Sequence, residues 1–174
     1  MRVEENTGEG IAPEHMDKAF DPFFLRVEGG RMMTRKILVI DYDLAFFKML
    51  REFLEDKGYS VTEVHDGEQA LEAYDQERPD VVMLAMVMPR MKSLVTLRKL
   101  KALDPGASIL MVSDVCEEEP ARQAMAEGAF DFITKPFIPD YLELALIAGT
   151  ALSGSVDRFD SNPVLFAIAT GTQA

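Results

Sequence analysis

The feature that most constrains the fold is a short apolar run followed by an amphipathic segment, a unit that repeats along the middle of the chain. Short, continuous apolar runs are typical of strands buried on both faces. The expected strands are 36–40, 59–64, 80–84, 108–113 and 130–134. The expected helices are 44–57, 68–74, 92–103, 120–127 and 139–152. This alternation predicts an α/β fold with a parallel sheet that right-handed crossovers cover on both faces.

The first expected helix shows how the pattern works. Asp43 precedes it and can cap its amino end, because a carboxylate accepts hydrogen bonds from the free N–H groups there. The apolar side chains recur at spacings of three and four, which predicts one buried stripe: Leu44, Phe47, Leu50, Phe53 and Leu54. Gly58 stands where a helix end favours a residue that tolerates positive φ.

Both ends of the chain differ from this middle part. Residues 1–33 are rich in Gly, Glu and Pro, and residues 153–174 mix Gly, Ser and Asp with an apolar patch at 163–168. We interpret both ends as tails, with the patch packing on the core or on a partner. The predicted domain therefore spans residues 34–152.

Composition disfavours several classes of function. The chain has 30 Asp and Glu against 18 Lys and Arg, a formal net charge of -12, which argues against binding nucleic acid or an anionic membrane. One cysteine, Cys116, rules out an intramolecular disulfide, and two histidines leave little for a zinc site. No apolar run reaches the roughly 20 residues that span a bilayer. We expect an acidic cytoplasmic protein.

Chemistry-bearing residues stand at the ends of four expected strands. In open parallel sheets, ligands and chemistry collect at the carboxyl ends of the strands, where this sequence has Asp41, Ala85, Ser113 and Lys135. We expect these four residues to lie at one edge of the sheet. The chain has no Gly-x-Gly-x-x-Gly after the first strand, no nucleophile elbow and no Cys–His pair, which disfavours an oxidoreductase or a hydrolase.

Residues 34–151 resemble the receiver domain of two-component response regulators. The motifs that carry the resemblance are Ile37-Leu38-Val39-Ile40-Asp41, Asp66-Gly67-Glu68-Gln69-Ala70-Leu71, Met88-Pro89, Ala126-Glu127-Gly128-Ala129 and Thr134-Lys135-Pro136-Phe137. The resemblance implies a doubly wound (βα)5 sheet of flavodoxin-like type with strand order 2-1-3-4-5. It also implies a phosphorelay signalling module that is not itself an enzyme.

In that family, an aspartate at the end of the third strand takes a phosphoryl group from a histidine kinase, beside Mg²⁺ and a lysine that neutralise the charge. Here the acceptor position is Ala85, and a methyl group cannot be phosphorylated. Tyr42 replaces the second metal-binding carboxylate. The family's other switch residues are kept as Ser113, Lys135 and the aromatic Phe132.

These departures predict a changed site. Only Asp41 and Asp43 remain as weak candidate ligands, and capping is the better role for Asp43, so we expect a weak Mg²⁺ site or none. Asp41 then faces Lys135 nearly alone, which predicts direct contact and a locally neutral pocket. We expect the Ser113 hydroxyl to satisfy loop backbone, and the bond before Pro136 to be cis as in other receivers.

The amino-terminal residues resemble a different family. Residues 6–14 and 20–24 are similar to two boxes of histidine-kinase ATP-binding domains, with Asn6 where that family has an adenine-recognising aspartate. About thirty residues are too few to enclose a nucleotide. We interpret residues 1–33 as a kinase-like remnant or flexible tail, or as upstream sequence included by an early start.

The leading hypothesis is a module that keeps the receiver shape and acts by protein contact. The expected partner is a signalling protein such as a histidine kinase or another regulator. A homodimer through the fourth-helix to fifth-helix face is also expected, and this face comprises 117–127, Phe132 and 141–147. No output domain follows, so we expect no nucleic-acid or membrane partner.

Two alternatives stay open. One is a receiver that is phosphorylated on a substitute residue, although we expect neither Asp80 nor Asp114 to be placed for transfer beside Lys135. The other is a fragment of a hybrid histidine kinase that works through its amino-terminal boxes.

Overall fold

A five-stranded parallel sheet forms the centre of the protein. The computed structural model describes residues 25–28, 31–88, 92–115 and 117–153. The strands are β3 (Lys36–Ile40), β4 (Ser60–Val64), β5 (Val81–Ala85), β6 (Ile109–Ser113) and β7 (Asp131–Thr134). They lie in the order β4-β3-β5-β6-β7, all parallel. Counted along the chain this is order 2-1-3-4-5, and the expected fold is confirmed.

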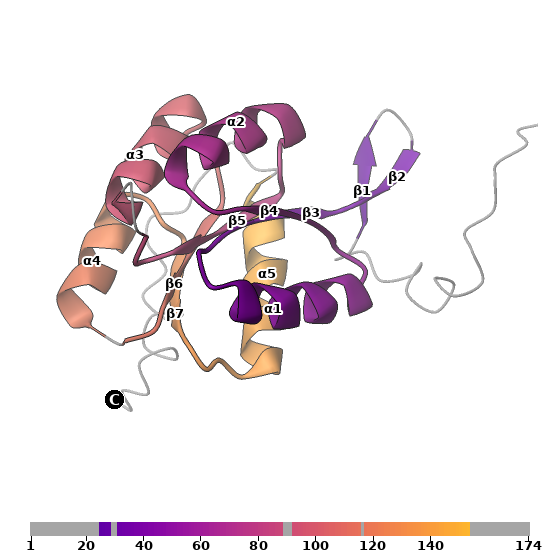
Figure 1. Cartoon of the computed structure of the whole chain (residues 1–174). Coiled ribbons are helices and arrows are strands. Elements are labelled where there is room, and N and C mark those ends of the chain that lie inside the picture. The colour runs from indigo at the N-terminus through magenta and orange to yellow at the C-terminus, as the bar shows by residue number, and fades with distance from the viewer. Residues whose placement is uncertain (1–24, 29–30, 89–91, 116, 154–174) are drawn as a thin grey trace, which may run out of the picture.

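The helices cover both faces of this sheet. One face carries α1 (Leu44–Asp56) and α5 (Pro139–Leu152), and the other carries α2 (Gly67–Glu77), α3 (Ser93–Leu103) and α4 (Glu118–Ala126) (Figure 1). All five expected helices are present. Their bounds differ from expectation mainly at α2, which continues to Glu77, and at α4, which begins at Glu118.

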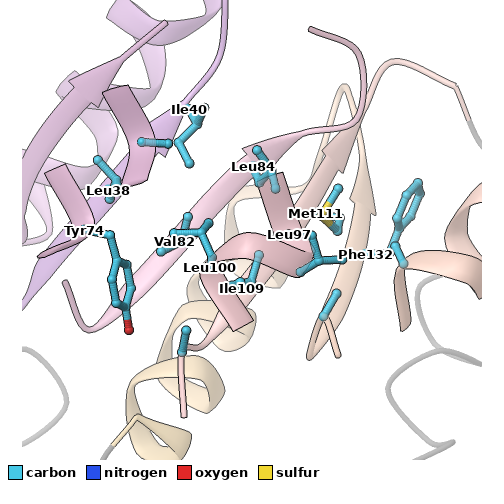
Figure 2. Close-up of a cluster of buried hydrophobic side chains, with 14 of the residues drawn as sticks. Leu38, Ile40, Tyr74, Val82, Leu84, Leu97, Leu100, Ile109, Met111 and Phe132 are labelled. Carbon is cyan, nitrogen blue, oxygen red and sulfur yellow. The ribbon is translucent and has the colours of Figure 1, made fainter. Parts of the chain in front are cut away.

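Two apolar layers hold the helices to the sheet. Ile37 and Val39 pack toward α1 and α5, whereas Leu38 and Ile40 belong to the cluster on the opposite face (Figure 2). Successive side chains of β3 are thus buried on opposite faces of the sheet. A central strand therefore has a continuous apolar run, because neither of its faces meets water. The core therefore fixes the directions in which the strand ends point.

Helix α1 shows one confirmed expectation and one correction. The Asp43 carboxylate accepts hydrogen bonds from the backbone N–H groups of Ala45 at 3.0 Å and Phe46 at 3.1 Å, which makes it the expected cap. Phe47 is buried as expected. Leu44 is not, because it is the first residue of the helix and lies beyond the sheet edge, where no core surrounds it.

Residues 25–34 form an element that was not expected. Strands β1 (Leu25–Glu28) and β2 (Arg31–Thr34) pair antiparallel, with Leu25 opposite Thr34. This corrects the interpretation of residues 25–33 as part of a flexible tail, since two glycines between two short segments are a hairpin signal. The kinase-like boxes and the patch at 163–168 lie outside the described residues. Within the described part of the chain, no helix has both the length and the apolar character that crossing a membrane requires.

Candidate functional site

The candidate site lies at the carboxyl edge of the sheet, where four adjacent strands end. Asp41 follows β3, Ala85 ends β5, Ser113 ends β6 and Lys135 follows β7. The Lys135 N–H donates to the Ser113 carbonyl at 2.7 Å, which holds the last two strand ends together. The parallel sheet thus brings the four expected residues to one edge.

Asp41 and Lys135 form an ion pair within the site. Lys135 Nζ donates a hydrogen bond to Asp41 Oδ2 at 2.8 Å, so the predicted contact between these two residues is present. The Asp41 side chain is 2% exposed and that of Lys135 is 12% exposed. The carboxylate and the ammonium therefore neutralise each other out of contact with most of the solvent.

The remaining polar atoms of Asp41 are also engaged. Its Oδ1 accepts a hydrogen bond from the Asp43 N–H at 2.9 Å, and its own N–H donates to the Val64 carbonyl at 3.3 Å. The Asp41 carbonyl oxygen lies 3.1 Å from Nδ1 of His65. Asp41 is therefore held by neighbours on both sides of β3.

Lys135 is held by more than one partner. Its Nζ lies 3.7 Å from the centre of the Phe46 ring, a cation–π contact, and Phe46 packs edge-on against Phe137 at 5.7 Å. Asp114 Oδ1 lies 3.6 Å from the same ammonium. Sequence reasoning did not find Phe46 or the nearness of Asp114. The available signal was an aromatic residue on α1 that lies outside its apolar stripe.

Ala85 occupies the tip of β5 and offers no nucleophile. It is 5% exposed, so its methyl group is enclosed among its neighbours. The Ser113 hydroxyl accepts a hydrogen bond from the Val115 N–H at 3.3 Å, as expected for a side chain that satisfies loop backbone.

The donor set does not fit a Mg²⁺ ion. Mg²⁺ requires hard oxygen ligands in near-octahedral geometry, but both oxygens of Asp41 are engaged and the Asp43 carboxylate caps α1. Tyr42 contributes a phenol where a second carboxylate would be needed. Within the described ranges, no three His, Cys, Asp or Glu side chains gather in a way that could hold a metal.

The switch position is packed inward. Phe132 is 6% exposed and belongs to the apolar cluster beneath α3 and α4 (Figure 2). Its N–H donates to Asp131 at 2.8 Å, and the Tyr141 hydroxyl donates to the same carboxylate at 2.9 Å. Burial raises the pKa of the Asp131 carboxyl above its usual range. The bond between Lys135 and Pro136 is cis, as expected.

The two acidic residues weighed as substitute acceptors lie in different places. Asp80 is at the amino edge, where its carboxylate accepts hydrogen bonds from Arg35 at 3.3 Å and the Lys36 N–H at 2.7 Å. It is therefore far from the site, as expected. Asp114 is exposed and lies beside Lys135, a nearness that was not expected from its place in a loop.

Comparisons with known proteins agree with this architecture. The response regulator receiver domain family matches residues 37–147. The chemotaxis protein CheY of Thermotoga maritima is 34% identical over 116 residues, which cover 66% of this chain and 96% of that protein. The chemotaxis protein CheY of Bacillus subtilis is 36% identical over 110 residues, covering 62% of this chain and 91% of that protein.

A solved structure shows the same fold. The receiver domain protein (CheY-like) of Methanospirillum hungatei superposes with a TM-score of 0.65 at 24% identity, covering 68% of this chain and 95% of that one. At this identity the similarity supports the arrangement of the strands and helices only.

Proposed function

This chain belongs to the response regulator receiver domain family, and from that premise we propose that it is a two-component signalling module that other proteins recognise without phosphorylating it at the usual position. The observation that carries the proposal is Ala85 at the tip of β5. Transfer of a phosphoryl group requires a nucleophilic atom whose lone pair forms the new bond to phosphorus. The methyl group of Ala85 has no lone pair with which to form it.

The electrostatics of the site support the same proposal. An incoming phosphoryl group brings negative charge, and an unengaged cation is needed to neutralise it in the transition state. Lys135 is the cation beside Asp41 at this edge, and it is already paired with that carboxylate at 2.8 Å. A phosphoryl group would have to displace that carboxylate without a bound metal ion to compensate.

The packing of Phe132 and the hydrogen bond between Tyr141 and Asp131 are consistent with a module that acts without a change of conformation at this position. Phe132 is buried in the core rather than turned toward solvent, and Asp131 and Tyr141 tie the start of β7 to α5. Signalling by such a module depends on which surfaces it presents. We propose a histidine kinase or another regulator as the partner class, with a homodimer through α4, β7 and α5 as a further mode. Leu144, exposed on α5, is available to such a contact.

Incubation with acetyl phosphate and Mg²⁺, followed by intact-mass analysis, tests the proposal. The mass of this chain should stay unchanged, while a receiver that has its aspartate, treated in parallel, gains one phosphoryl group. A labile gain of one phosphoryl group by this chain overturns the proposal.

A second candidate function is phosphorylation of a substitute residue, and one observation favours it. Asp114 is exposed and its Oδ1 lies 3.6 Å from Lys135 Nζ. Attack by this carboxylate on acetyl phosphate would form an acyl phosphate and release acetate. If a phosphoryl group is gained, Asp114→Asn should abolish the gain, and Asp43→Asn should not.

A further inference from the structure

The hairpin of β1 and β2 is a two-stranded sheet of its own. It continues from the amino end of β3, beyond the edge of the five-stranded sheet (Figure 1). Among the described strands, β1 pairs with β2 and with no other. A two-stranded hairpin alone is marginally stable in water, and an unpaired strand edge is a template for a further strand. Within the described residues, the outer edge of β1 therefore lacks a strand partner.

The base of the hairpin is fixed to the sheet at Arg35, the residue between β2 and β3. The Arg35 carbonyl accepts a hydrogen bond from the Ser60 N–H at 2.9 Å. The Arg35 guanidinium donates to the Asp80 carboxylate and to the Thr150 carbonyl, each at 3.3 Å. The folded domain thus holds the point from which the hairpin leaves the sheet. Such preorganisation lowers the entropy cost of binding through the hairpin.

The backbone groups of β1 point alternately toward β2 and away from it. Hydrogen-bonded and non-hydrogen-bonded positions alternate along an antiparallel pair, and the residues that flank a two-residue loop form a hydrogen-bonded pair. Glu28 and Arg31 are the flanking residues here. Arg26 then also faces β2, whereas the N–H and C=O groups of Leu25 and Val27 point outward. A strand added to this edge would therefore bond to Val27.

Charge selects one register for a second copy of β1. A twofold axis at this edge can pass through Arg26 or through Val27, and both choices use the outward backbone groups. An axis through Arg26 places two arginines opposite each other, and like charges directly opposite destabilise a sheet. An axis through Val27 places Arg26 of each copy opposite Glu28 of the other. The edge is therefore complementary to itself in this second register.

Local charge at the hairpin does not prevent two copies of an acidic chain from meeting there. The whole chain has a net charge of -12, but Arg35 and Lys36 at the hairpin base are basic and are already paired with Asp80 and Glu77. The charged residues that remain in the hairpin are Arg26, Glu28 and Arg31. This segment is thus close to neutral, and the local repulsion that opposes association is small.

We propose that β1 is a self-association edge, through which two copies of this chain pair antiparallel about Val27 and form one four-stranded sheet. A second copy is favoured over an unrelated strand because the Arg26–Glu28 pairing is satisfied twice in one symmetric register. Two four-residue strands make a small interface, so the dimer should be weak and concentration-dependent. The proposal does not rest on the proposed function, and this edge is distinct from the α4–β7–α5 face.

Sedimentation equilibrium of the full chain, from micromolar to millimolar concentration, tests the proposal. The weight-average mass should rise above that of one chain as concentration increases. Arg26→Glu and Glu28→Arg should each weaken association about tenfold, because like charges then lie opposite each other at two symmetry-related positions. An equimolar mixture of the two variants should associate more tightly than either alone, since the acidic residues of one variant then lie opposite the basic residues of the other.

Three further variants separate backbone pairing at β1 from other contacts. Val27→Pro removes an outward N–H, which an edge strand tolerates, so the hairpin should persist while association is lost. Val27→Thr keeps the N–H and the preference for a strand, and it should leave the dissociation constant nearly unchanged. Leu144→Ser alters an exposed side chain on α5 and should also leave it unchanged.

A chain that stays monomeric up to millimolar concentration overturns the proposal, and so does a mixture that associates no better than its two separate variants. A dimer that Val27→Pro leaves intact also overturns it, and sensitivity of that dimer to Leu144→Ser would place the contact on α5. A phosphoryl group gained from acetyl phosphate would contradict the proposed function and leave these outcomes unchanged. Failure of the one is therefore distinguishable from failure of the other.

Discussion

Lys135 Nζ and Asp41 Oδ2 lie 2.8 Å apart, although they follow β7 and β3, two strands that β5 and β6 separate in the sheet. The lysine side chain therefore spans the ends of both intervening strands. A carboxylate at position 85 would compete with Asp41 for this ammonium. With a methyl group there, the ion pair is the arrangement that satisfies both charges.

Removing the cation from this pair should strongly destabilise the fold. Lys135→Met leaves the Asp41 carboxylate buried with no ammonium beside it, and breaking a buried pair in this way costs about 3–5 kcal/mol. The free energy of unfolding, measured by urea denaturation, should fall by that amount.

A double variant shows whether the loss of stability in Lys135→Met comes from its interaction with Asp41. Adding Asp41→Asn to Lys135→Met removes the unpaired charge, so the double variant should be more stable than Lys135→Met alone. Additive losses in this cycle would mean that the two residues do not stabilise each other.

Restoring a carboxylate at the tip of β5 should make stability depend on Mg²⁺. Ala85→Asp encloses a second negative charge near Asp41 and should lower the free energy of unfolding by about 2 kcal/mol. Mg²⁺ should offset this loss, because a ligand at a hundredfold excess over its Kd stabilises the folded state by about 2.7 kcal/mol. Thermal denaturation with and without Mg²⁺ measures both effects.

Ala85→Asn is the matched control, since it adds the same volume without the charge. Its melting temperature should not respond to Mg²⁺, and neither should that of the unmodified chain. An equal response of all three proteins to Mg²⁺ contradicts the view that the donors at this edge do not fit the ion.

The parts of the site that follow from topology were predictable from the sequence. Asp41 and Lys135 each come directly after a strand, so a parallel sheet brings them to the same edge, and opposite charge then brings them into contact. The continuous apolar run before Ala85 placed this residue at the end of a strand, and its interpretation as a replaced acceptor came from the resemblance to receivers.

The parts that depend on loop and helix-end geometry were not predictable. Phe46, near the start of α1, contacts the Lys135 ammonium, and Asp114, directly after β6, lies 3.6 Å from the same ammonium. Leu44 fits the periodicity of a buried stripe, yet it lies beyond the sheet edge. Periodicity reports which face of a helix is apolar and not how far the core extends along it.

Gly149 should not tolerate a side chain, although it lies inside α5. Alanine is favoured over glycine in a helix by about 1 kcal/mol. A Cβ at this position would lie 2.6 Å from Phe130 Cζ and 3.0 Å from Val81 Cγ2, however, and such overpacking costs about 1–3 kcal/mol. Gly149→Ala should therefore lower the free energy of unfolding in urea, and adding Phe130→Leu should recover part of the loss. A stabilised single variant contradicts this packing.

The stability that Asp131 contributes should depend on pH, whereas that of its isosteric amide should not. Burial raises the pKa of Asp131 in the folded protein, so between the unfolded and folded pKa values the native state binds more protons than the unfolded state. Its contribution to stability therefore falls as pH rises through that interval. Asp131→Asn keeps an acceptor for the Phe132 N–H but cannot titrate.

As pH is lowered from 7 toward 4, the free energy of unfolding of the unmodified chain should therefore rise relative to that of Asp131→Asn. Tyr141→Phe supplies the internal check, because the Tyr141 hydroxyl donates to the carboxylate at 2.9 Å and holds its pKa down. Removing that donor should raise the Asp131 pKa further and make the decline with rising pH steeper. Urea denaturation across this pH range measures all three proteins, and a difference that does not change with pH would show that Asp131 carries the same charge in both states.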